Sequence, residues 1–448
     1  MNLFGTLTEP VRLIARYHEL LWCLSRYGIA GSITSLGIEF GKRGVTWVAP
    51  QSVNHTGFDA VFGQNLARTF QEMGPTFIKL GQVLATRPDI VGDGVAKELE
   101  ILFSRVRPVS LREIKRILNK ELGKKKVKEQ IVSIESEPLG SASIGQCHRA
   151  TLKDGSSVVI KVQKPGVAKA IQLDLKLLEW FIKPAVLAFP KLGLGEMYRD
   201  FRDSTLREID YREEAKNIEQ FKKNYRKILS GSDVVFPGYY RELSTSRVIV
   251  LEPMRGKPVA DLKKGTRSAK QAAFKSLAAV FEQIFEHGFF HADPHSANIF
   301  FLEEEGRMGF IDTGLVGQLD PKDKKLFLQV LMSIIRRDRK KLAESLYQLG
   351  EPSPNTKFDE FESAIQALLD EVKAKGLEQV KLDQLVNQLL AIARQNQIYI
   401  PNRYVMMIRS CLIIEGVAKG LDPKVSIFKV AVPVVAKSLL KSYNPLGR

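Results

Sequence analysis

The feature that most constrains how this chain can fold is a set of polar residues in its second half. In the segment His291-Ala292-Asp293-Pro294-His295-Ser296-Ala297-Asn298, an aspartate and an asparagine stand at Asp-x4-Asn spacing. Strand-like residues follow, and then Asp312-Thr313-Gly314. Two carboxylates and an amide oxygen suit a hard cation such as magnesium, which prefers oxygen ligands. The fold is therefore expected to bring these three polar side chains together.

The same spacing is typical of the catalytic loop of kinases, in which the aspartate serves the acceptor and the asparagine helps to hold metal. On this pattern Asp293 is the candidate catalytic residue, and Asn298 and Asp312 are candidate metal ligands. Each piece alone is weak, because such spacings arise by chance and aspartates often cap helices. An alternative uses His291, Asp293 and His295 as transition-metal ligands. It leaves the other two residues without a role.

Upstream, from residue 131 to about residue 252, the pattern changes to short strands. Ile144 to Thr151, an Asp154-Gly155 turn and Ser157 to Val162 together indicate a hairpin. Alternation puts the aliphatic residues of the second strand on one face and Lys161 on the other. An inward lysine needs an anionic partner to offset its desolvation. ATP phosphates and a helix glutamate can provide one.

Two further segments have the positions expected of nucleotide-binding elements. The small-residue run before the hairpin lets backbone amides approach phosphate closely, although it matches neither GxGxxG nor a Walker A sequence. An apolar strand ending at Leu251 leads into a segment that resembles an interlobe hinge, where backbone atoms can read adenine. The candidate residues of these segments are Leu139, Gly140, Ser141, Ala142, Ser143, Ile144, Gly145, Gln146, Cys147, Glu252 and Met254.

A charged helix is predicted through Glu208-Ile209-Asp210-Tyr211-Arg212-Glu213-Glu214-Ala215. On one continuous helix Asp210, Glu214 and Asn217 would share a face. Glu208 and Glu214 would project about 120° apart and could serve different partners. The other interpretation is an exposed helix with ordinary surface ion pairs and, separately, a lysine on an edge strand.

Helical patterns dominate the N-terminal part of the chain. Residues from about Pro10 to Gly28 mix apolar side chains with arginines, as in a basic amphipathic helix. Such a helix can lie on a membrane or pack on the protein's own body, because the pattern does not identify what the apolar face meets. A second helical region runs from Phe58 to Leu84, and a third begins after Ser110, with Glu113 completing a capping box.

Charge and cysteine content bound the class of protein. The formal charge is +17, so the surface should attract anions such as nucleotides, acidic lipid headgroups or nucleic acid. No recognisable nucleic-acid-binding module is present, and we expect no nucleic-acid partner. The three cysteines show no CxxC spacing, which favours a reducing, cytoplasmic setting. No run reaches the roughly 18 to 20 apolar residues that a spanning helix needs, so membrane contact is expected to be peripheral.

Together with Lys79-Leu80-Gly81-Gln82, these motifs resemble the UbiB family of atypical kinase-like proteins, whose bacterial and organellar members are linked to ubiquinone biosynthesis. The family's KxGQ motif stands here as KLGQ, its ExD motif as Glu208-Ile209-Asp210, its small-residue loop as LGSASIGQ and its catalytic segment as HADPHSAN. The resemblance covers roughly residues 60 to 345.

The resemblance implies roles for individual residues. Lys161 would contact ATP phosphates and pair with Glu214, and Asp293 would be the catalytic aspartate. Asn298 and Asp312 would bind magnesium. Family members place the KxGQ helix across the site where a protein kinase receives its peptide, which adds Lys79, Gln82 and Glu208 to the ATP site and predicts that Lys79 meets Glu208 or bound nucleotide.

Departures from known patterns also carry information. Ala292 replaces the usual arginine of protein kinases, Thr313 replaces phenylalanine, and no Ala-Pro-Glu segment follows. A groove for peptide substrates is therefore doubtful, and an ATPase or a small-molecule or lipid-directed kinase is favoured. Many bacterial members end in membrane-spanning segments, whereas Val425 to Leu440 is short and contains two lysines.

The sequence thus predicts an α+β, protein-kinase-like, two-lobed fold with an added N-terminal helical extension. The expected divisions are an amphipathic segment at 1–50, the KLGQ-bearing extension at 51–130, a β-rich N-lobe at 131–254 and a helical C-lobe at 255–448. The predicted function is an ATP- and magnesium-dependent atypical kinase or ATPase at the inner face of a membrane, supporting ubiquinone or related isoprenoid-lipid biosynthesis. Anionic or isoprenoid lipid is an expected partner; contacts with ubiquinone-biosynthesis enzymes and a homodimer are left open. Alternatives are a non-catalytic ATP-switched lipid-binding or complex-assembly module, and a protein kinase.

Overall fold

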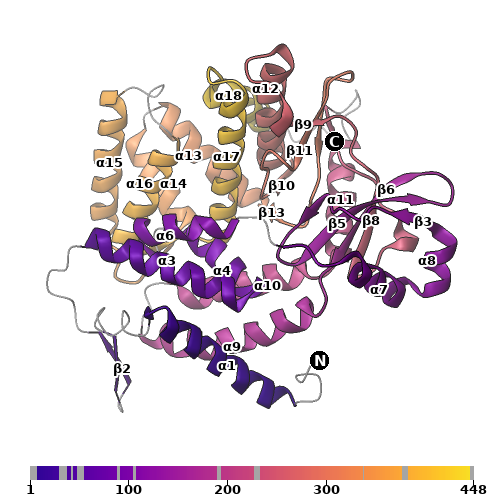
Figure 1. Ribbon diagram of the computed structural model, residues 1–448. Coiled ribbons are helices and arrows are strands. Elements are labelled where there is room, and N and C mark those ends of the chain that lie inside the picture. Colours follow the sequence, from indigo (N-terminus) through magenta and orange to yellow (C-terminus); the bar gives the residue numbers. More distant parts are fainter. Residues whose placement is uncertain are drawn as a thin grey trace. The chain divides into compact units, whose positions relative to one another are not determined.

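The computed structural model (Figure 1) describes residues 8–29, 38–41, 44–47, 55–87, 91–103, 107–188, 193–226, 233–336, 338–375 and 382–443. The chain forms two compact units. Unit 1 comprises Met1–Asp210 and Thr245–Val248, and unit 2 comprises Tyr211–Ser244 and Ile249–Arg448. This division follows packing within the chain, and the boundaries expected at residues 50, 130 and 254 stay predictions.

Unit 1 is built mainly from helices that pack on one another. Its elements in chain order are α1 (Glu9–Arg26), the β1 (Ile38–Gly41) and β2 (Gly44–Trp47) hairpin, α3 (His55–Met73), α4 (Pro75–Ala85), α6 (Asp93–Leu99), η2 (Glu100–Phe103), α7 (Leu111–Leu122), α8 (Lys124–Gln130), β3 (Ile131–Ile134), β4 (Gly140–Ser141), β5 (Gly145–Leu152), β6 (Ser157–Gln163), α9 (Val167–Ala188) and α10 (Leu194–Glu208). The helix predicted from Phe58 to Leu84 is two helices, because Gly74 has a φ of 92° and Pro75 begins the next helix.

The N-terminal amphipathic helix packs on its own unit. Leu13, Leu20 and Cys23 of α1 are buried in a cluster with side chains of α3, α4 and α9. The sequence left open whether the apolar face of α1 meets a membrane or the protein itself. The face with Leu13, Leu20 and Cys23 packs on the protein itself. A second strip of α1, with Val11, Ile14 and Trp22, is about half exposed.

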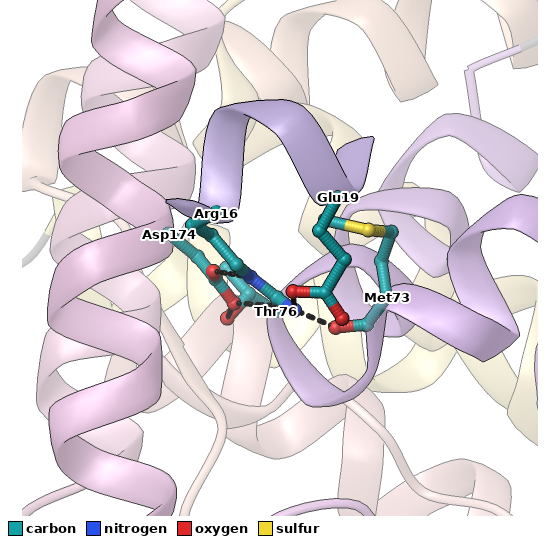
Figure 2. Close-up of polar contacts among 5 residues, drawn as sticks. All are labelled: Arg16, Glu19, Met73, Thr76 and Asp174. Atoms are coloured by element: carbon teal, nitrogen blue, oxygen red, sulfur yellow. Dashed lines mark hydrogen bonds and ion pairs between the residues drawn. The ribbon is translucent and has the colours of Figure 1, made fainter. Parts of the chain in front are cut away.

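A buried ionic cluster fixes α1 against two other helices of unit 1 (Figure 2). Nε of Arg16 donates to Oδ1 of Asp174 on α9 at 2.7 Å, and Nη2 donates to Oδ2 at 3.2 Å. The same guanidinium also donates to the Met73 carbonyl at the end of α3. The Thr76 hydroxyl, in the first turn of α4, donates to Asp174 at 2.6 Å. One carboxylate thus joins α1, α4 and α9.

The predicted hairpin of unit 1 is confirmed. β5 and β6 pair antiparallel, with Ala150 opposite Val158 and Cys147 opposite Lys161, and Gly155 takes a φ of 85° in the turn. β3 and β4 both pair with β5. The capping prediction also holds, since the Ser110 hydroxyl accepts the Glu113 amide at the start of α7.

Unit 2 combines small sheets with long helices (Figure 1). Its elements are α11 (Tyr211–Arg226), β7 (Val234–Val235), η4 (Arg241–Leu243), β8 (Val248–Leu251), which starts at the last residue of unit 1, β9 (Lys257–Pro258), η5 (Val259–Asp261), α12 (Arg267–Phe281), the π-helical turn η6 (Glu282–His287), β10 (Phe289–His291), β11 (Ile299–Leu302), β12 (Arg307–Phe310), β13 (Val316–Gln318), α13 (Pro321–Arg336), α14 (Arg339–Leu349), β14 (Glu351–Pro352), α15 (Phe358–Lys375), α16 (Leu382–Gln395), β15 (Ile398–Tyr399), α17 (Asn402–Leu421) and α18 (Ile427–Tyr443).

The core of unit 2 lies between these helices and the strands around the catalytic segment. One sheet has the order β7-β12-β11-β9, and β10 pairs with β13. Phe221, Phe290 and Phe310 are buried in one cluster with the inner faces of α12 and α17. Because strands β10 to β13 are anchored in this core, the loops between them are held at fixed positions.

The prediction of one continuous helix through the Glu208–Ala215 segment is wrong. α10 ends at Glu208 and α11 begins at Tyr211. The Asp210 amide donates to the Arg207 carbonyl at 3.1 Å, which tightens the end of α10, and the Ile209 side chain turns into the core of unit 1. The boundary between the two units falls at this break, so Glu208 belongs to unit 1 and Glu214 to unit 2.

Candidate nucleotide and catalytic site

The small-residue loop and Lys161 lie close together in unit 1. Lys161 on β6 is opposite Cys147, and the flanking Ile160 and Val162 are fully buried, so the lysine points to the other face of the strand. Gly140 and Ser141 pair with the start of β5. A Cβ atom added at Gly140 would have no neighbour within 4 Å. The loop therefore keeps open space beside its backbone at Gly140, which is opposite Cys147, the same residue that is opposite Lys161.

Two residues of the small-residue loop, Ile144 and Gln146, make structural contacts inside unit 1. The Ile144 side chain is buried against α9 and α10. Gln146 is almost fully buried, and its amide accepts the Val109 N–H at 2.9 Å and donates to the Val109 carbonyl at 3.1 Å. Its amide nitrogen also lies 2.8 Å from Nε2 of His148. The side chain of Gln146 thus holds the chain before α7, and the cofactor-binding role of the loop stays a prediction.

In the KLGQ motif, Gly81 allows close packing and Lys79 forms an ion pair. A Cβ atom at Gly81 would lie 2.2 Å from the Leu102 side chain and 2.7 Å from the Phe70 ring, so only glycine lets α4 approach this closely. The Gln82 amide donates to the Leu102 carbonyl at 2.8 Å. Lys79 forms an ion pair with Glu208 at the end of α10. The expected contact between these two residues is confirmed.

In unit 2, His291 is a neutral anchor of the catalytic segment. Its Nδ1 accepts the Asp293 amide at 3.1 Å and its Nε2 lies 2.9 Å from the Ile311 carbonyl, to which it can donate. Complete burial lowers the pKa of His291, which keeps the ring neutral. Both ring nitrogens are therefore occupied, which argues against His291 as a metal ligand. Across the part of the chain that the structure describes, no cluster of three or more His, Cys, Asp or Glu side chains could hold a metal ion.

Asn298, just before β11, and Asp312, just after β12, are brought near each other by the pairing of these strands. The Asn298 amide nitrogen donates to the Asp293 carbonyl at 3.2 Å, which leaves the amide oxygen as the atom that can face a cation. The Asn298 carbonyl accepts the Ile311 amide at 2.9 Å. Asp312 has a φ of 54°, a left-handed conformation that aspartate tolerates better than most residues.

Two carboxylates gather beside Gly314. A Cβ atom at this glycine would lie 3.6 Å from Oδ1 of Asp312 and 3.7 Å from Oε2 of Glu214. The Asn217 amide donates to the Thr313 carbonyl at 2.8 Å, and the Thr313 hydroxyl donates to the Glu214 carbonyl at 3.3 Å. α11 is thereby tied to the turn that carries Asp312. The two carboxylates therefore border the same space beside Gly314.

The Asp293 carboxylate has a partner that the sequence did not indicate. Nη2 of Arg409, on α17, lies 3.5 Å from Oδ1 of Asp293, and the two side chains are 22% and 32% exposed. The next residue, Ser410, donates its hydroxyl to the His291 carbonyl at 2.8 Å. α17 therefore contacts the catalytic segment at both its backbone and its carboxylate. No local pattern marks either residue, because both contacts join distant parts of the chain.

The hinge candidates lie in unit 2. The Glu252 amide donates to the Gly238 carbonyl at 2.9 Å, and its carboxylate accepts the Gly238 amide at 2.8 Å. The Met254 thioether packs on Gly309, where an added Cβ atom would lie 2.5 Å from the sulfur. Their role in reading adenine stays a prediction.

Comparison with known families decides what these motifs belong to. Residues 101–346 match the ABC1 atypical kinase-like domain, and residues 365–426 match the UbiB helical domain. The chain belongs to the UbiB family. The expected α+β, kinase-like fold with preceding helices is thereby confirmed. The UbiB helical domain includes all of α17, the helix that contacts Asp293.

Relatives of the UbiB family extend over most of this chain. A "Probable protein kinase UbiB" of Cellvibrio japonicus is 33% identical over 395 residues, which cover 86% of this chain and 70% of the relative. An "Uncharacterized protein in hydrogenase 1 5'region" of Clostridium pasteurianum is 31% identical over 384 residues, which cover 83% of this chain and 70% of that protein.

Among solved structures, the chain is similar to the Rv3197–erythromycin complex of Mycobacterium tuberculosis, with 21% identity and a TM-score of 0.46 over 77% of this chain and 90% of that one. It is also similar to a Rio2 kinase complex with ADP, magnesium and phosphoaspartate from Chaetomium thermophilum, with 13% identity and a TM-score of 0.29 over 74% and 98% of the two chains.

The predicted site of this UbiB protein thus falls into two groups, each assembled within its unit. Lys161, the small-residue loop and the Lys79–Glu208 pair belong to unit 1, and Glu214, Asp293, Asn298 and Asp312 belong to unit 2. The pairing of Lys161 with Glu214 would join the units and stays a prediction. None of the described helices is long and apolar enough to cross a membrane.

Proposed function

We propose that this UbiB protein is a magnesium-ATP-dependent atypical kinase or ATPase that acts at a membrane surface in support of ubiquinone or related isoprenoid-lipid biosynthesis. The observation that carries the proposal is the gathering of catalytic-loop and acidic groups in unit 2. Asp312 and Glu214 lie beside one glycine, and Asn298 is bonded to the backbone of Asp293. This donor set consists of oxygens, as magnesium requires.

The side chains of unit 2 have distinct tasks in this proposal. Asp312 and the amide oxygen of Asn298 hold magnesium, which when bound neutralises charge on the phosphates. The Asp293 carboxylate accepts a proton from the attacking hydroxyl or water, because the group stands in the catalytic segment and is partly exposed. His291 keeps the Asp293 backbone in place through its neutral ring.

The side chains of unit 1 supply the phosphate contacts. Lys161 contacts ATP phosphates and pairs with Glu214, while the loop at residues 139–147 covers the phosphates with backbone amides. The open space beside Gly140 supports this role, since no side chain of the described residues fills it. The Lys79–Glu208 ion pair sets the position of the KLGQ helix near the nucleotide.

Contact with a membrane is supported by an exposed apolar strip on unit 1. Val11, Ile14 and Trp22 of α1 are 45%, 51% and 54% exposed, and Trp180 of α9 is 51% exposed. The Tyr17 ring, on α1, stacks on the Phe181 ring of α9 with centroids 5.8 Å apart, so the two helices present their exposed residues from one packed pair. Arg26 lies over the Trp22 ring and is paired with Glu72 at 3.0 Å, and the exposed tryptophans suit the interface of a membrane.

Hydrolysis and binding of magnesium-ATP test the site. We expect wild-type protein to bind magnesium-ATP and to hydrolyse it faster with anionic vesicles, and Asp312→Asn to lose binding and turnover. Asp359→Asn is a suitable control, because Asp359 is an exposed carboxylate in the first turn of α15. If Asp312→Asn and Asp359→Asn both behave as wild type, the assignment of the metal site is wrong.

Vesicle sedimentation tests the membrane surface. The double variant Trp22→Ser/Trp180→Ser should bind anionic vesicles more weakly than wild type. Phe274→Ser removes an equally exposed aromatic ring from unit 2 and should leave binding unchanged. Equal loss in both variants would mean that the strip on α1 and α9 is not the contact surface.

A second candidate is a non-catalytic module that uses ATP to change conformation around a lipid or partner enzyme. The contact of Asp293 with Arg409 favours it, because a carboxylate that faces a guanidinium of α17 is less free to approach an attacking hydroxyl or water. This candidate predicts tight ATP binding and any residual turnover unaffected by Asp293→Asn. Turnover that disappears with Asp293→Asn excludes it.

The relatives' name suggests phosphorylation of proteins. If the KLGQ helix only blocks a peptide groove, breaking the Lys79–Glu208 ion pair by Lys79→Ala with Glu208→Ala should release activity on peptides. A double variant that folds, binds ATP and still leaves peptides unmodified would reject this candidate.

A further inference from the structure

A pocket of about 440 Å³ lies in unit 2 beside the catalytic segment. One wall is the segment from Val259 to Lys264, a second is His295 and Ser296, and the third is one face of α17. The volume falls in the range of small-molecule sites. His295 and Ser296 follow Asp293 in the same loop, so this pocket touches the catalytic segment without including its aspartate.

The lining combines aliphatic groups with a small set of polar donors. Val259, Leu262, Ile413 and Val417 supply apolar surface. The ionisable lining residues are Lys264 and His295, and none of the lining residues is an acid. Ser296 adds a hydroxyl. The chemistry therefore matches a ligand with a short aliphatic body and an anionic end.

Two glycines of α17 leave space on the pocket side. Gly416 and Gly420 stand one helical turn apart and both line the pocket. A Cβ atom added at either position would have no neighbour within 4 Å. Glycine weakens a helix interior relative to alanine, and no packing contact of the described residues requires it here. These glycines enlarge the pocket and do not serve close packing of α17.

We propose that this pocket binds an alkyl phosphate. The alkyl chain lies along the α17 face at Gly416 and Val417, against Leu262, and the phosphate is bound by Lys264, His295 and Ser296. A phosphate is favoured over a carboxylate because it offers three oxygens to this set of donors. The binding does not depend on the proposed function.

Occupancy should also affect the catalytic segment, and this part rests on the proposed function. α17 carries the pocket face and, at Arg409 and Ser410, the contacts with Asp293 and the His291 carbonyl. A ligand that packs on the same helix changes how firmly α17 holds the loop. We therefore expect octyl phosphate to change the rate of ATP turnover.

Calorimetric titration of the whole 448-residue chain with octyl phosphate, below its micellar concentration and with magnesium-ATP present, tests the binding. Saturable binding is expected, and Gly416→Leu should weaken it by about tenfold or more by filling the pocket. Gly416→Ala is the matched control, because it adds one methyl group in open space and should retain binding while raising the melting temperature. Lys264→Ala should weaken octyl phosphate binding and leave the weak binding of octanol unchanged.

Several outcomes would overturn the proposal. Unchanged affinity in a folded Gly416→Leu protein would put the ligand elsewhere. Octanol, octanoate or inorganic phosphate binding as tightly as octyl phosphate would contradict the assigned chemistry. These results are separable from failure of the proposed function, which would appear as absent magnesium-ATP binding in the wild-type protein, while titration without nucleotide still reports on the pocket.

Discussion

Two arginine–aspartate pairs, one in each unit, show how the same chemistry is used for different ends. Arg16 meets Asp174 through two nitrogens at 2.7 and 3.2 Å, and the Asp174 side chain is 1% exposed. Arg409 meets Asp293 through a single nitrogen at 3.5 Å, and that carboxylate is 32% exposed. The first pair is enclosed and the second is open.

The difference lies in what else surrounds each carboxylate. Asp174 also accepts the Thr76 hydroxyl, and its guanidinium partner reaches the Met73 carbonyl as well. These bonds satisfy a buried charge and leave it no freedom. Asp293 instead has its backbone fixed through His291 and its carboxylate held loosely. A fixed backbone with a partly exposed carboxylate is compatible with the proton transfer that we propose for Asp293.

The largest expected effect is on turnover and comes from the open pair. Asp293→Asn keeps the shape of the side chain and removes its ability to accept a proton. We expect turnover to fall by about 10²- to 10⁴-fold, with unfolding free energy changed by no more than about 1 kcal/mol because the pair is partly exposed. Steady-state ATPase rates and urea denaturation measure both. A large loss of stability would mean that this pair is structural, like its counterpart in unit 1.

The enclosed pair should give the opposite result. Asp174→Asn leaves the buried guanidinium of Arg16 without its counter-charge, and we expect a loss of about 3–5 kcal/mol in the stability of unit 1. Asp203→Asn, which breaks an exposed pair with Arg202, is the control and should cost about 0–1 kcal/mol. Urea denaturation followed by tryptophan fluorescence gives the comparison. Similar costs for the two variants would contradict the buried role of Asp174.

A smaller effect is a pH dependence of folding stability that comes from His291, which holds the backbone of Asp293 in the open pair. Burial lowers the pKa of His291 below its unfolded value, so the unfolded state binds the proton more tightly. His291 therefore favours folding above about pH 6.5, and this contribution is lost as the pH falls below that value, by up to about 1.4 kcal/mol per unit. His291→Gln should show a flatter stability profile between pH 7 and 5. Equal slopes in the two proteins would mean that His291 does not titrate on unfolding.

Local patterns in the sequence were sufficient for the elements that depend on near neighbours. The Asp154-Gly155 turn and the alternation around Lys161 predicted the hairpin, and Ser110 with Glu113 three residues on predicted the helix cap. The Gly74-Pro75 dipeptide also signalled a helix break, although the apolar pattern across it suggested one helix.

Contacts across long distances in the chain had no such signal. Neither glycine nor proline marks a break at Ile209 and Asp210, and the burial of Ile209 in the core of unit 1 accompanies the end of α10 there. Asp174 and Arg16 read as ordinary helix residues, and so does Arg409. Their partners are set by how helices pack, which periodicity alone does not determine.

The smallest expected effect tests whether Arg409 positions Asp293. Arg409→Ala removes one partly exposed pair and should cost about 0–1 kcal/mol in stability. If the guanidinium orients the carboxylate, turnover should fall severalfold at unchanged affinity for ATP, and Arg409→Lys should restore part of it because the charge returns without the forked geometry. Lys419→Ala, on the same helix and paired with Glu415, controls for changes in α17 itself. A rise in turnover with Arg409→Ala would instead mean that the arginine restrains Asp293, and the open pair would then be an inhibitory contact.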